Sequence, residues 1–236
     1  NIVDLSSEIQ IKPFDIKFQT LTHSIPEPNS LFIKTKLGTI YHTGDWKIDD
    51  NPIVGESIDF NQLKENSEEV LAMVCDSTNV LTSGRSGSES TVRGNLTGVI
   101  KKFKNRVFVT SFASNVARLE TIAAAAKESG RSLVVLGRSM HRMISVARQN
   151  GILKDIDVIL SEKDAAKKKK HEVLYLCTGS QGEPRGAMMR ISNQDFPHID
   201  IDQDDCVIFS SKIIPGNEKK IFKLFNRLSE LGAEVI

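Results

Sequence analysis

The stretch Val107-Phe108-Val109-Thr110-Ser111-Phe112-Ala113-Ser114-Asn115 decides the fold of this 236-residue chain. Its first four residues are apolar or β-branched, which is typical of a strand that is buried on both faces. Its last five residues are mostly small and polar. After them, apolar side chains recur at helical spacing, on Val116, Leu119, Ile122, Ala123 and Ala126. The stretch therefore predicts a buried strand that leads through a polar turn directly into an amphipathic helix.

The same alternation recurs on either side of this stretch. Apolar, strand-like runs occupy residues 133–136, 173–177 and 206–209, and helical spacing occurs at 92–103, 140–147 and 221–231. Strands and helices that alternate in this way indicate a parallel sheet with helices on both faces. Residues 79–236 are thus predicted to form an α/β domain.

Residues 1–78 have a different pattern. Short strand-like runs at 16–22, 31–35, 39–43 and 70–75 are separated by turn residues, such as Lys36-Leu37-Gly38. Runs of this length and spacing predict an antiparallel meander. The chain therefore divides into a small β-rich part, residues 1–78, and a larger α/β part, residues 79–236.

The charges divide at the same place. Residues 1–78 carry six Lys and Arg against 13 Asp and Glu, a net charge of −7, and residues 79–236 carry 25 against 17, a net charge of +8. An acidic part suits metal cations and a basic part suits a polyanion, although a lysine-rich surface that is merely solvated has the same charge.

The overall composition is ordinary for a globular protein, with 39% hydrophobic and 26% charged residues. No run reaches the roughly 18 apolar residues of a membrane span, and no basic-then-apolar leader opens the chain, so we expect a cytoplasmic protein that does not enter a membrane. Cys75, Cys177 and Cys206 lie in apolar runs and predict buried, reduced thiols. Because the chain starts at Asn1 without Met and ends soon after a glycine that closes a helix, we expect further sequence beyond both ends.

Polar residues gather where the strands of the second part end, at 111–115, 137–139, 178–184 and 210–217. Carboxyl ends of parallel strands share one edge of a sheet, where helix N-termini and glycine-rich turns bind anions. These junctions predict contact with phosphate or ribose from the following residues: Ser114, Asn115, Arg118, Arg138, Ser139, Ser180, Gln181 and Gly182.

Simpler roles stay open for these residues. Ser114, Asn115, Ser139 and Asn217 also suit helix caps. The usual signatures of a nucleotide-cofactor site, G-x-G-x-x-G after a strand and G-x-x-x-x-G-K-[ST], do not occur. The run 167–170 is all lysine and predicts an exposed loop or helix end, with RNA contact as the alternative.

His23 and Asp45 lie just past two predicted strands of the first part. An imidazole and a carboxylate on neighbouring loops can share metal ions. A hydrogen-bonded turn is the ordinary alternative for such a pair. Trp46, beside them, suits either base stacking or packing.

Taken together, these motifs resemble the signature sequences of bacterial ribonuclease J. The matching runs are His23-Ser24-Ile25-Pro26, Tyr41-His42-Thr43-Gly44-Asp45-Trp46-Lys47, Asp76-Ser77-Thr78-Asn79, Ser111-Phe112-Ala113-Ser114-Asn115, Gly137-Arg138-Ser139-Met140, Thr178-Gly179-Ser180-Gln181-Gly182-Glu183-Pro184 and Pro215-Gly216-Asn217-Glu218. That family belongs to the β-CASP branch of the metallo-β-lactamase superfamily. The resemblance implies an α/β fold in which residues 1–78 are the C-terminal part of the first segment of an αββα sandwich. Residues 79–236 are then most of a β-CASP domain, a mainly parallel sheet flanked by helices.

The resemblance also implies a chemistry. His23 matches the third metal-binding motif, Asp45 matches the fourth, which bridges two zinc ions, and Asp76 matches an acid at the mouth of the active site. The implied reaction is hydrolysis of RNA phosphodiester bonds by a metal-bridging hydroxide, in a 5′-exonucleolytic mode, an endonucleolytic mode or both. The implied substrate is single-stranded RNA with a 5′-monophosphate, and the implied full-length protein is a homo-oligomer.

The chain departs from that family in one respect. The main metal motif, H-x-H-x-D-H, and the later H-V-S-G-H and P-V-H-G runs do not occur in these 236 residues. Since two ligands are too few for two zinc ions, we expect this stretch alone to bind zinc sub-stoichiometrically or not at all, and to be inactive. A non-catalytic RNA-binding or scaffolding subunit, and a β-CASP nuclease that acts on DNA, stay open as alternatives.

Overall fold

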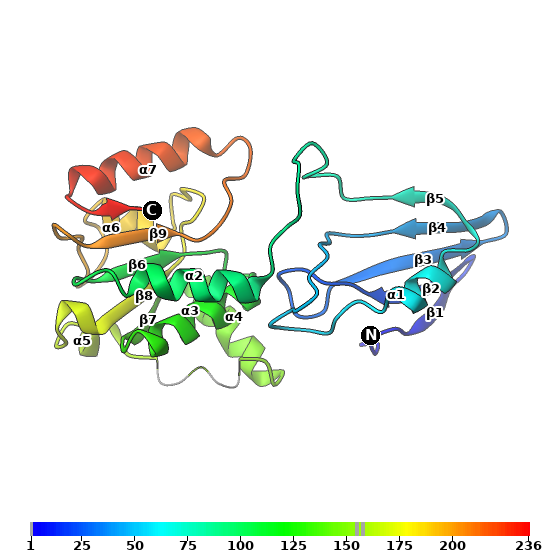
Figure 1. Cartoon of the computed structure of the whole chain (residues 1–236), viewed down its shortest axis with the longest axis horizontal. Helices are drawn as coiled ribbons and strands as arrows, with labels where there is room; N and C mark the ends of the chain where they lie inside the picture. Colours follow the sequence, from blue (N-terminus) through cyan, green and yellow to red (C-terminus); the bar gives the residue numbers. More distant parts are fainter. Residues whose placement is uncertain (1, 154–155, 157–158) are drawn as a thin grey trace. The chain divides into compact units, whose positions relative to one another are not determined.

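The computed structural model describes residues 2–153, 156 and 159–236. The chain separates into two compact units, Asn1–Ser90 and Thr91–Ile236. Each unit has its own β-sheet and helices (Figure 1).

The first unit is built on a five-stranded sheet. Its strands are β1 (Glu8–Ile11), β2 (Phe14–Thr20), β3 (Asn29–Thr35), β4 (Gly38–His42) and β5 (Val70–Val74), in the order β1-β2-β3-β4-β5. The antiparallel pairing of β2, β3 and β4 is as predicted, and β1, which the sequence did not predict, pairs antiparallel with β2. By contrast, β5 runs parallel to β4. The prediction of a complete meander is therefore wrong. The chain returns through helix α1 (Phe60–Asn66) before β5 begins, so β5 enters the sheet from the same end as β4.

Polar contacts hold α1 to this sheet. The Asp59 carboxylate caps the first turn of the helix and accepts the N–H groups of Asn61 and Gln62 at 3.0 and 3.1 Å. The buried Gln19 of β2 donates to Oε1 of Gln62 and accepts from Nδ2 of Asn66, both at 3.1 Å. Hydrophobic periodicity does not reveal this helix, because none of its residues is buried.

The second unit is built on a parallel sheet, as the sequence predicts. Its strands are β6 (Val107–Thr110), β7 (Ser132–Leu136), β8 (Val173–Cys177), β9 (Cys206–Phe209) and β10 (Glu234–Val235). They lie in the order β10-β9-β6-β8-β7, and every neighbouring pair is parallel. All residues of β6 and β8 are buried, because helices cover both faces of the sheet.

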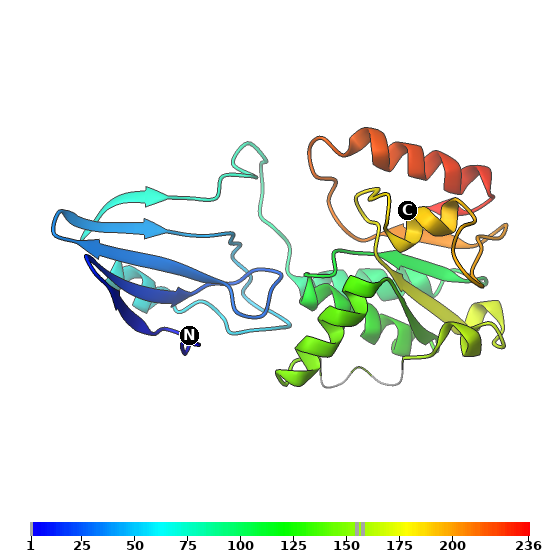
Figure 2. The same cartoon turned by 180° about the vertical axis from the view of Figure 1, so that it is seen from behind.

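Helices α6 (Ala187–Ser192) and α7 (Glu218–Glu230) lie on one face of the parallel sheet. Helices α2 (Glu89–Ile100), α3 (Val116–Glu128) and α4 (Arg138–Gln149) lie on the other (Figures 1 and 2). The core beneath α6 and α7 contains the stacked rings of Phe108 and Tyr175, 4.6 Å apart, together with Met188 and Leu224. The sequence does not predict α6 or the single-turn α5 (Glu162–Ala165), because both are too short to show a helical period.

Two of the cysteines are buried, as predicted, and the third is not. Cys177 and Cys206 lie in β8 and β9, where burial raises the thiol pKa, to about 12 for Cys206. Cys75 is exposed, which corrects the prediction for this residue. It follows β5, an edge strand whose side chains are mostly uncovered.

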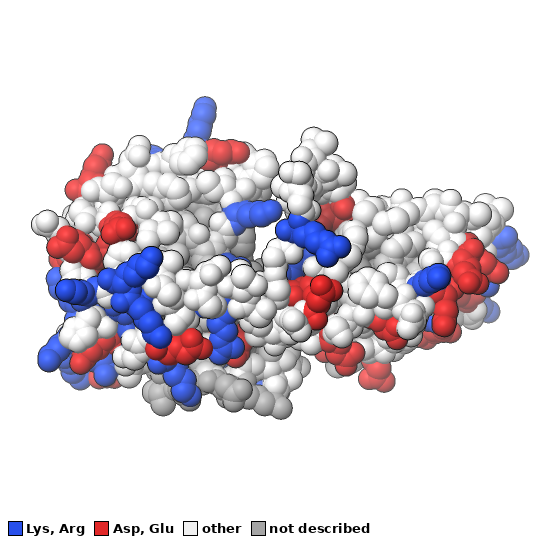
Figure 3. Space-filling model, viewed as in Figure 1, with Lys and Arg blue, Asp and Glu red and all other residues white. Residues whose placement is uncertain are grey.

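The two units carry opposite charge. Residues 1–90 have seven Lys and Arg against 14 Asp and Glu, a net charge of −7, and residues 91–236 have 24 against 16, a net charge of +8. Figure 3 shows Lys and Arg side chains gathered on the second unit, with Asp and Glu between them. The lysine run 167–170 is exposed and follows α5, as predicted for a helix end. None of the helices in the described ranges has the length and hydropathy of a membrane span.

Candidate functional site

Three loops of the first unit start at one edge of its sheet. Both β2 and β4 run antiparallel to β3, and β5 runs parallel to β4, so the carboxyl ends of β2, β4 and β5 lie at the same edge. His23 follows β2, Asp45 follows β4 and Asp76 follows β5, each after at most two intervening residues. The strand topology therefore brings the loops of these three predicted residues together.

Hydrogen bonds tie the three loops to one another. Thr22, directly before His23, pairs with Lys47 in an isolated antiparallel bridge. The Lys47 N–H donates to the Thr22 carbonyl at 2.9 Å, and the Thr22 hydroxyl donates to the Lys47 carbonyl at 2.5 Å. On the other side, the Asp76 N–H donates to Oγ1 of Thr43 at 3.0 Å. The loop that carries Asp45 is thus held to both of its neighbours.

The Asp76 carboxylate is stabilised in its ionised form. Its Oδ1 accepts the Thr78 hydroxyl at 2.6 Å and the Thr78 N–H at 2.9 Å. These bonds, followed by the charge of His23 and the N–H of Trp46, hold the pKa of Asp76 below its ordinary range. The Asp45 side chain is exposed, and His23 is partly buried, with Oγ of Ser24 3.2 Å from its Nδ1.

His23 and Asp45 are of the donor types that zinc takes in proteins. Over residues 2–153, 156 and 159–236, however, no three His, Cys, Asp or Glu side chains form a group that could hold a metal ion. The donors are right in kind and too few in number, so the described part of the chain does not fit a zinc ion by itself. His42, in the same region, stabilises the turn that follows β4, because its Nδ1 accepts the Gly44 N–H at 3.1 Å.

Sequence reasoning missed two residues that organise these loops. Thr43 links the Asp45 loop to Asp76, and the buried Asp49 links it to Thr22, whose Oγ1 accepts the Asp49 N–H at 3.1 Å. No local pattern marks either residue, because their partners lie far away in the chain.

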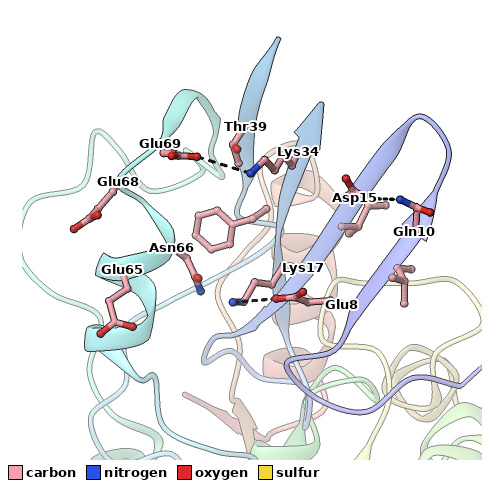
Figure 4. Close-up of a pocket in the computed structure, with 13 residues that line it drawn as sticks. Glu8, Gln10, Asp15, Lys17, Lys34, Thr39, Glu65, Asn66, Glu68 and Glu69 are labelled. Atoms are coloured by element: carbon pink, nitrogen blue, oxygen red, sulfur yellow. Dashed lines mark hydrogen bonds and ion pairs between the residues drawn. The ribbon is translucent and has the colours of Figure 1, made fainter. Parts of the chain in front are cut away.

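A hollow of about 600 Å³ beside α1 offers a different surface (Figure 4). Its two cations are paired, Lys17 with Glu8 at 3.2 Å and Lys34 with Glu69 at 3.9 Å. The other charged residues that line it are acidic, namely Asp15, Glu65 and Glu68. This surplus of negative charge does not suit a polyanion.

The polar loops of the second unit meet at the carboxyl edge of the parallel sheet, as predicted. The Ser111 N–H donates to the Cys177 carbonyl, and the Thr178 N–H donates to the Leu136 carbonyl, both at 3.2 Å. The Ser210 N–H donates back to the last residue of β6 at 3.0 Å. The loops after β6, β7, β8 and β9 therefore start side by side.

A hollow of about 610 Å³ lies among these loops, and two predicted residues, Ser114 and Ser139, line it. Both are exposed, as is Arg138 at the start of α4. The lining also contains Arg142 and Glu183, which sequence reasoning did not single out. The signal for Arg142 was available, because it lies four residues after Arg138 on the same helix.

Asn115 and Arg118 have structural partners. The Asn115 side chain caps α3 and accepts the Arg118 N–H at 2.9 Å, so the capping alternative is confirmed for this residue. The Arg118 guanidinium donates to the carbonyl and the hydroxyl of Ser210 at 2.7 and 2.8 Å. Asn217 lies at the N-cap of α7, but its side chain makes no capping bond.

Ser180, Gln181 and Gly182 lie inside the structure. Gln181 is 4% exposed, and it donates to the Lys212 carbonyl and accepts the Ile214 N–H, both at 2.9 Å. The Ser180 hydroxyl is buried without a hydrogen-bond partner among the described residues. Gly182 has a positive φ of 68°, and a β-carbon there would lie 2.9 Å from the carbonyl carbon of Lys220. These three residues are buried and stabilise the loop after β8. Their contact with RNA stays a prediction.

Residues 104–228 match the family described as "Ribonuclease J, beta-CASP domain", and this stretch contains β6, β7, β8 and β9 with the polar loops at their carboxyl ends. The second unit is therefore a β-CASP domain, a class consistent with the metallo-β-lactamase superfamily. The chain belongs to the ribonuclease J family.

Named relatives agree with this assignment. The chain is 42% identical over 229 residues to Ribonuclease J of Sinorhizobium meliloti, covering 97% of the chain and 41% of that protein. It is 42% identical over 227 residues to Ribonuclease J of Synechocystis sp., covering 95% and 36%. It is 34% identical over 232 residues to Ribonuclease J2 of Bacillus subtilis, covering 98% and 42%. The chain thus spans about two fifths of the length of these relatives.

The fold is also found among solved structures, of which one example follows. It is a protein of unknown function from Enterococcus faecalis V583, with a TM-score of 0.62, 12% sequence identity, and coverage of 99% of this chain and 54% of that one.

Proposed function

We propose that the whole protein is a metal-dependent ribonuclease that hydrolyses phosphodiester bonds of single-stranded RNA in RNA processing and decay. The observation that carries the proposal is the arrangement of the His23, Asp45 and Asp76 loops, which hydrogen bonds join at one sheet edge. Membership of the ribonuclease J family supports the choice of RNA over DNA.

In this proposal His23 and Asp45 are metal ligands, and the other ligands of a two-zinc site come from the rest of the protein. The length of the relatives supports this division, since the chain spans only about two fifths of them. Bound zinc would supply charge neutralisation at the scissile phosphate and a water of lowered pKa. Asp76 would serve as an acidic residue at the mouth of the site, with its carboxylate held by Thr78, and its main-chain N–H would keep the Asp45 loop in place through Thr43.

The carboxyl edge of the parallel sheet is the proposed RNA surface. Arg138 and Arg142 are exposed there, and Arg142, Ser114 and Ser139 line one hollow. A guanidinium pairs with phosphate through two parallel hydrogen bonds, which suits an RNA backbone or a 5′-monophosphate. Exonucleolytic cleavage from the 5′ end, endonucleolytic cleavage or both fall within the proposal.

A cytoplasmic location and a homo-oligomeric state belong to the same proposal. The free, buried thiols of Cys177 and Cys206 are consistent with a reducing compartment.

The test uses the complete protein and a single-stranded RNA with a 5′-monophosphate and a fluorescent 3′ end. We expect Asp45→Ala to abolish cleavage in the presence of zinc while RNA binding, measured by fluorescence anisotropy, stays close to that of the wild type. Asp50→Ala removes an exposed carboxylate from the same loop and is the control, with cleavage retained. Near-normal cleavage by Asp45→Ala would contradict the metal assignment. The 236-residue stretch alone is expected to be inactive.

A second candidate is a non-catalytic RNA-binding or scaffolding subunit. It is favoured by the shortage of metal ligands among the described residues. In that case the wild-type complete protein binds the same RNA but leaves it intact with zinc present.

A further inference from the structure

The side chain of Asp49 lies where three segments of the first unit meet. The residue is 5% exposed and lies four positions beyond Asp45 in the chain. Its N–H donates to Oγ1 of Thr22, the residue directly before His23. Its carboxylate contacts a third segment, residues 87–89, where α2 begins.

Both oxygens of this carboxylate are used. Oδ2 accepts the Glu89 N–H at 3.2 Å and lies 3.1 Å from Nζ of Lys47. Oδ1 accepts the Asn51 N–H at 3.1 Å. The Asp49 carboxylate therefore joins its own turn to the start of α2 through the Glu89 N–H, and Lys47 and Asn51 fix the carboxylate from within that turn.

Two further hydrogen bonds join residues 47–51 to residues 87–89, and we call this contact the junction. Nζ of Lys47 reaches the Gly87 carbonyl at 3.5 Å, and the Ser88 hydroxyl donates to the Asn51 carbonyl at 3.1 Å. The segment at 87–89 is thus attached to the loop at both ends of the turn formed by residues 47–51.

The electrostatics of Asp49 favour this single arrangement. Burial by itself would raise the pKa of Asp49, but the hydrogen bonds that the carboxylate accepts, among them those from Glu89, Lys47 and Asn51, outweigh it, and the pKa lies below its ordinary range. The side chain is therefore a buried anion at neutral pH. Any rearrangement that withdraws the start of α2 or Lys47 removes a hydrogen bond or the counter-charge from this buried anion, which is costly in a protein interior.

We infer that Asp49 is a positioning residue for the nuclease reaction. Its main-chain N–H holds the loop of Asp45 to Thr22, directly before His23, and its carboxylate holds the same loop to the start of α2 through the Glu89 N–H. We assign Asp49 no role as a metal ligand, because its carboxylate oxygens are already bound by Lys47, Glu89 and Asn51. The inference rests on the proposed function, since the positions of Asp45 and His23 matter to catalysis only if both take part in it.

The test compares Asp49→Asn with Asp50→Asn in the complete protein. Asp50 is the matched control, because it is the next residue and its side chain is exposed. We expect Asp49→Asn to lower kcat by about 10- to 100-fold through misplacement of the Asp45 loop, with KM for the RNA nearly unchanged. Asp50→Asn should leave both constants unchanged.

Hydrogen–deuterium exchange gives a readout that does not depend on activity. In Asp49→Asn, the peptides that cover residues 45–51 and 87–92 should exchange about tenfold faster, while peptides of the parallel sheet in the second unit do not change. Lys47→Met provides a second variant in case Asp49→Asn fails to fold, because it removes only the cation from the junction. It should accelerate exchange in the same two peptides and lower kcat by about threefold or more.

The outcomes separate this inference from the proposed function. If Asp49→Asn exchanges faster but keeps its kcat, Asp49 joins the segments without positioning the site. If Asp49→Asn exchanges at the wild-type rate, Asp49 does not hold the segments together. Either result overturns the inference while leaving the ribonuclease assignment in place. If the wild-type complete protein does not cleave RNA, the proposed function is wrong, and Asp49 then has no nuclease reaction for which it could be a positioning residue.

Discussion

Gly137 lies directly against Thr178: a β-carbon on Gly137 would be 2.4 Å from Oγ1 of Thr178. Gly137 also has a φ of 115°, a conformation that residues with a side chain rarely adopt. The Thr178 hydroxyl accepts the Ala187 N–H at 3.0 Å, at the start of α6. The turn that presents Arg138 and Ser139 therefore requires glycine, both for its backbone and for the space beside Thr178.

Gly137→Ala is expected to lower the free energy of unfolding by about 2–4 kcal/mol, because it combines overpacking with backbone strain. Gly94→Ala is the matched control, since a β-carbon there meets nothing within 4 Å and Gly94 lies inside α2. The control should be neutral or more stable by up to about 1 kcal/mol. Urea unfolding followed by far-ultraviolet circular dichroism measures both, and equal stability of the two variants would refute the packing argument.

Arg131 is buried, and among the described residues its guanidinium binds main-chain carbonyls rather than a carboxylate. It is 7% exposed and donates to the carbonyls of Phe103, Asn105 and Val173 at 2.6, 2.8 and 3.1 Å. Arg131→Met leaves these three acceptors unsatisfied and is expected to cost about 3 kcal/mol of stability. Arg93→Met, which removes a half-exposed partner of Glu128, should cost less than about 1 kcal/mol. Thermal unfolding distinguishes the two, and a cost for Arg131→Met no larger than that of the control would contradict the assignment.

The carboxyl edge of the parallel sheet can be tested as an RNA surface through salt dependence. If Arg138 and Arg142 each contact a phosphate, Arg138→Ala and Arg142→Ala should each weaken RNA binding and reduce the slope of log K against log salt by about 0.7. Fluorescence anisotropy with single-stranded RNA, between about 50 and 300 mM KCl, measures this slope. Lys163→Ala is the control, because Lys163 is exposed on α5, before the amino end of β8. Slopes that fall equally in all three variants would indicate a general charge effect.

The stability of the second unit should depend on pH through Asp202. The carboxylate lies 2.9 Å from Nζ of Lys170 and 2.5 Å from the guanidinium of Arg106. The hydrogen bond from Lys170 and the charges of both cations hold the pKa of Asp202 below its ordinary range. Because the pKa is lower in the folded chain than in the unfolded one, the stabilisation is complete above the unfolded value of about 4 and is lost as the pH falls through the lower, folded value.

Asp202→Asn should therefore reduce stability by up to about 1 kcal/mol at pH 7, a modest amount since the side chain is half-exposed. The difference from wild type should shrink as the pH falls below about 4. Asp204→Asn, at a neighbouring exposed carboxylate, is the control. A difference between wild type and Asp202→Asn that stays constant from neutral to acid pH would argue against the ion pairs.

The sequence predicted most of the second unit, because burial on both faces leaves a local trace. The runs at 107–110, 133–136, 173–177 and 206–209 are apolar for that reason, and all of them are strands of the parallel sheet. The polar loops at their ends were predicted as well, since carboxyl ends of parallel strands must share an edge. Helix α1 escaped prediction because it buries no side chain, and α6 because it is too short to show a period.

The sequence by itself determined the alternation of strand and helix, the opposite charges of the two parts, and the loops that hold His23, Asp45 and Asp76. Tertiary structure alone decided that β5 runs parallel to β4, that Cys75 is exposed, that Gln181 is enclosed, and that Asp49 joins three segments. The physical reason is that periodicity records only which face of a local element is buried. A hydrogen bond such as that from the Glu89 N–H to Asp49 joins residues 40 positions apart, and it leaves no pattern in the residues between them.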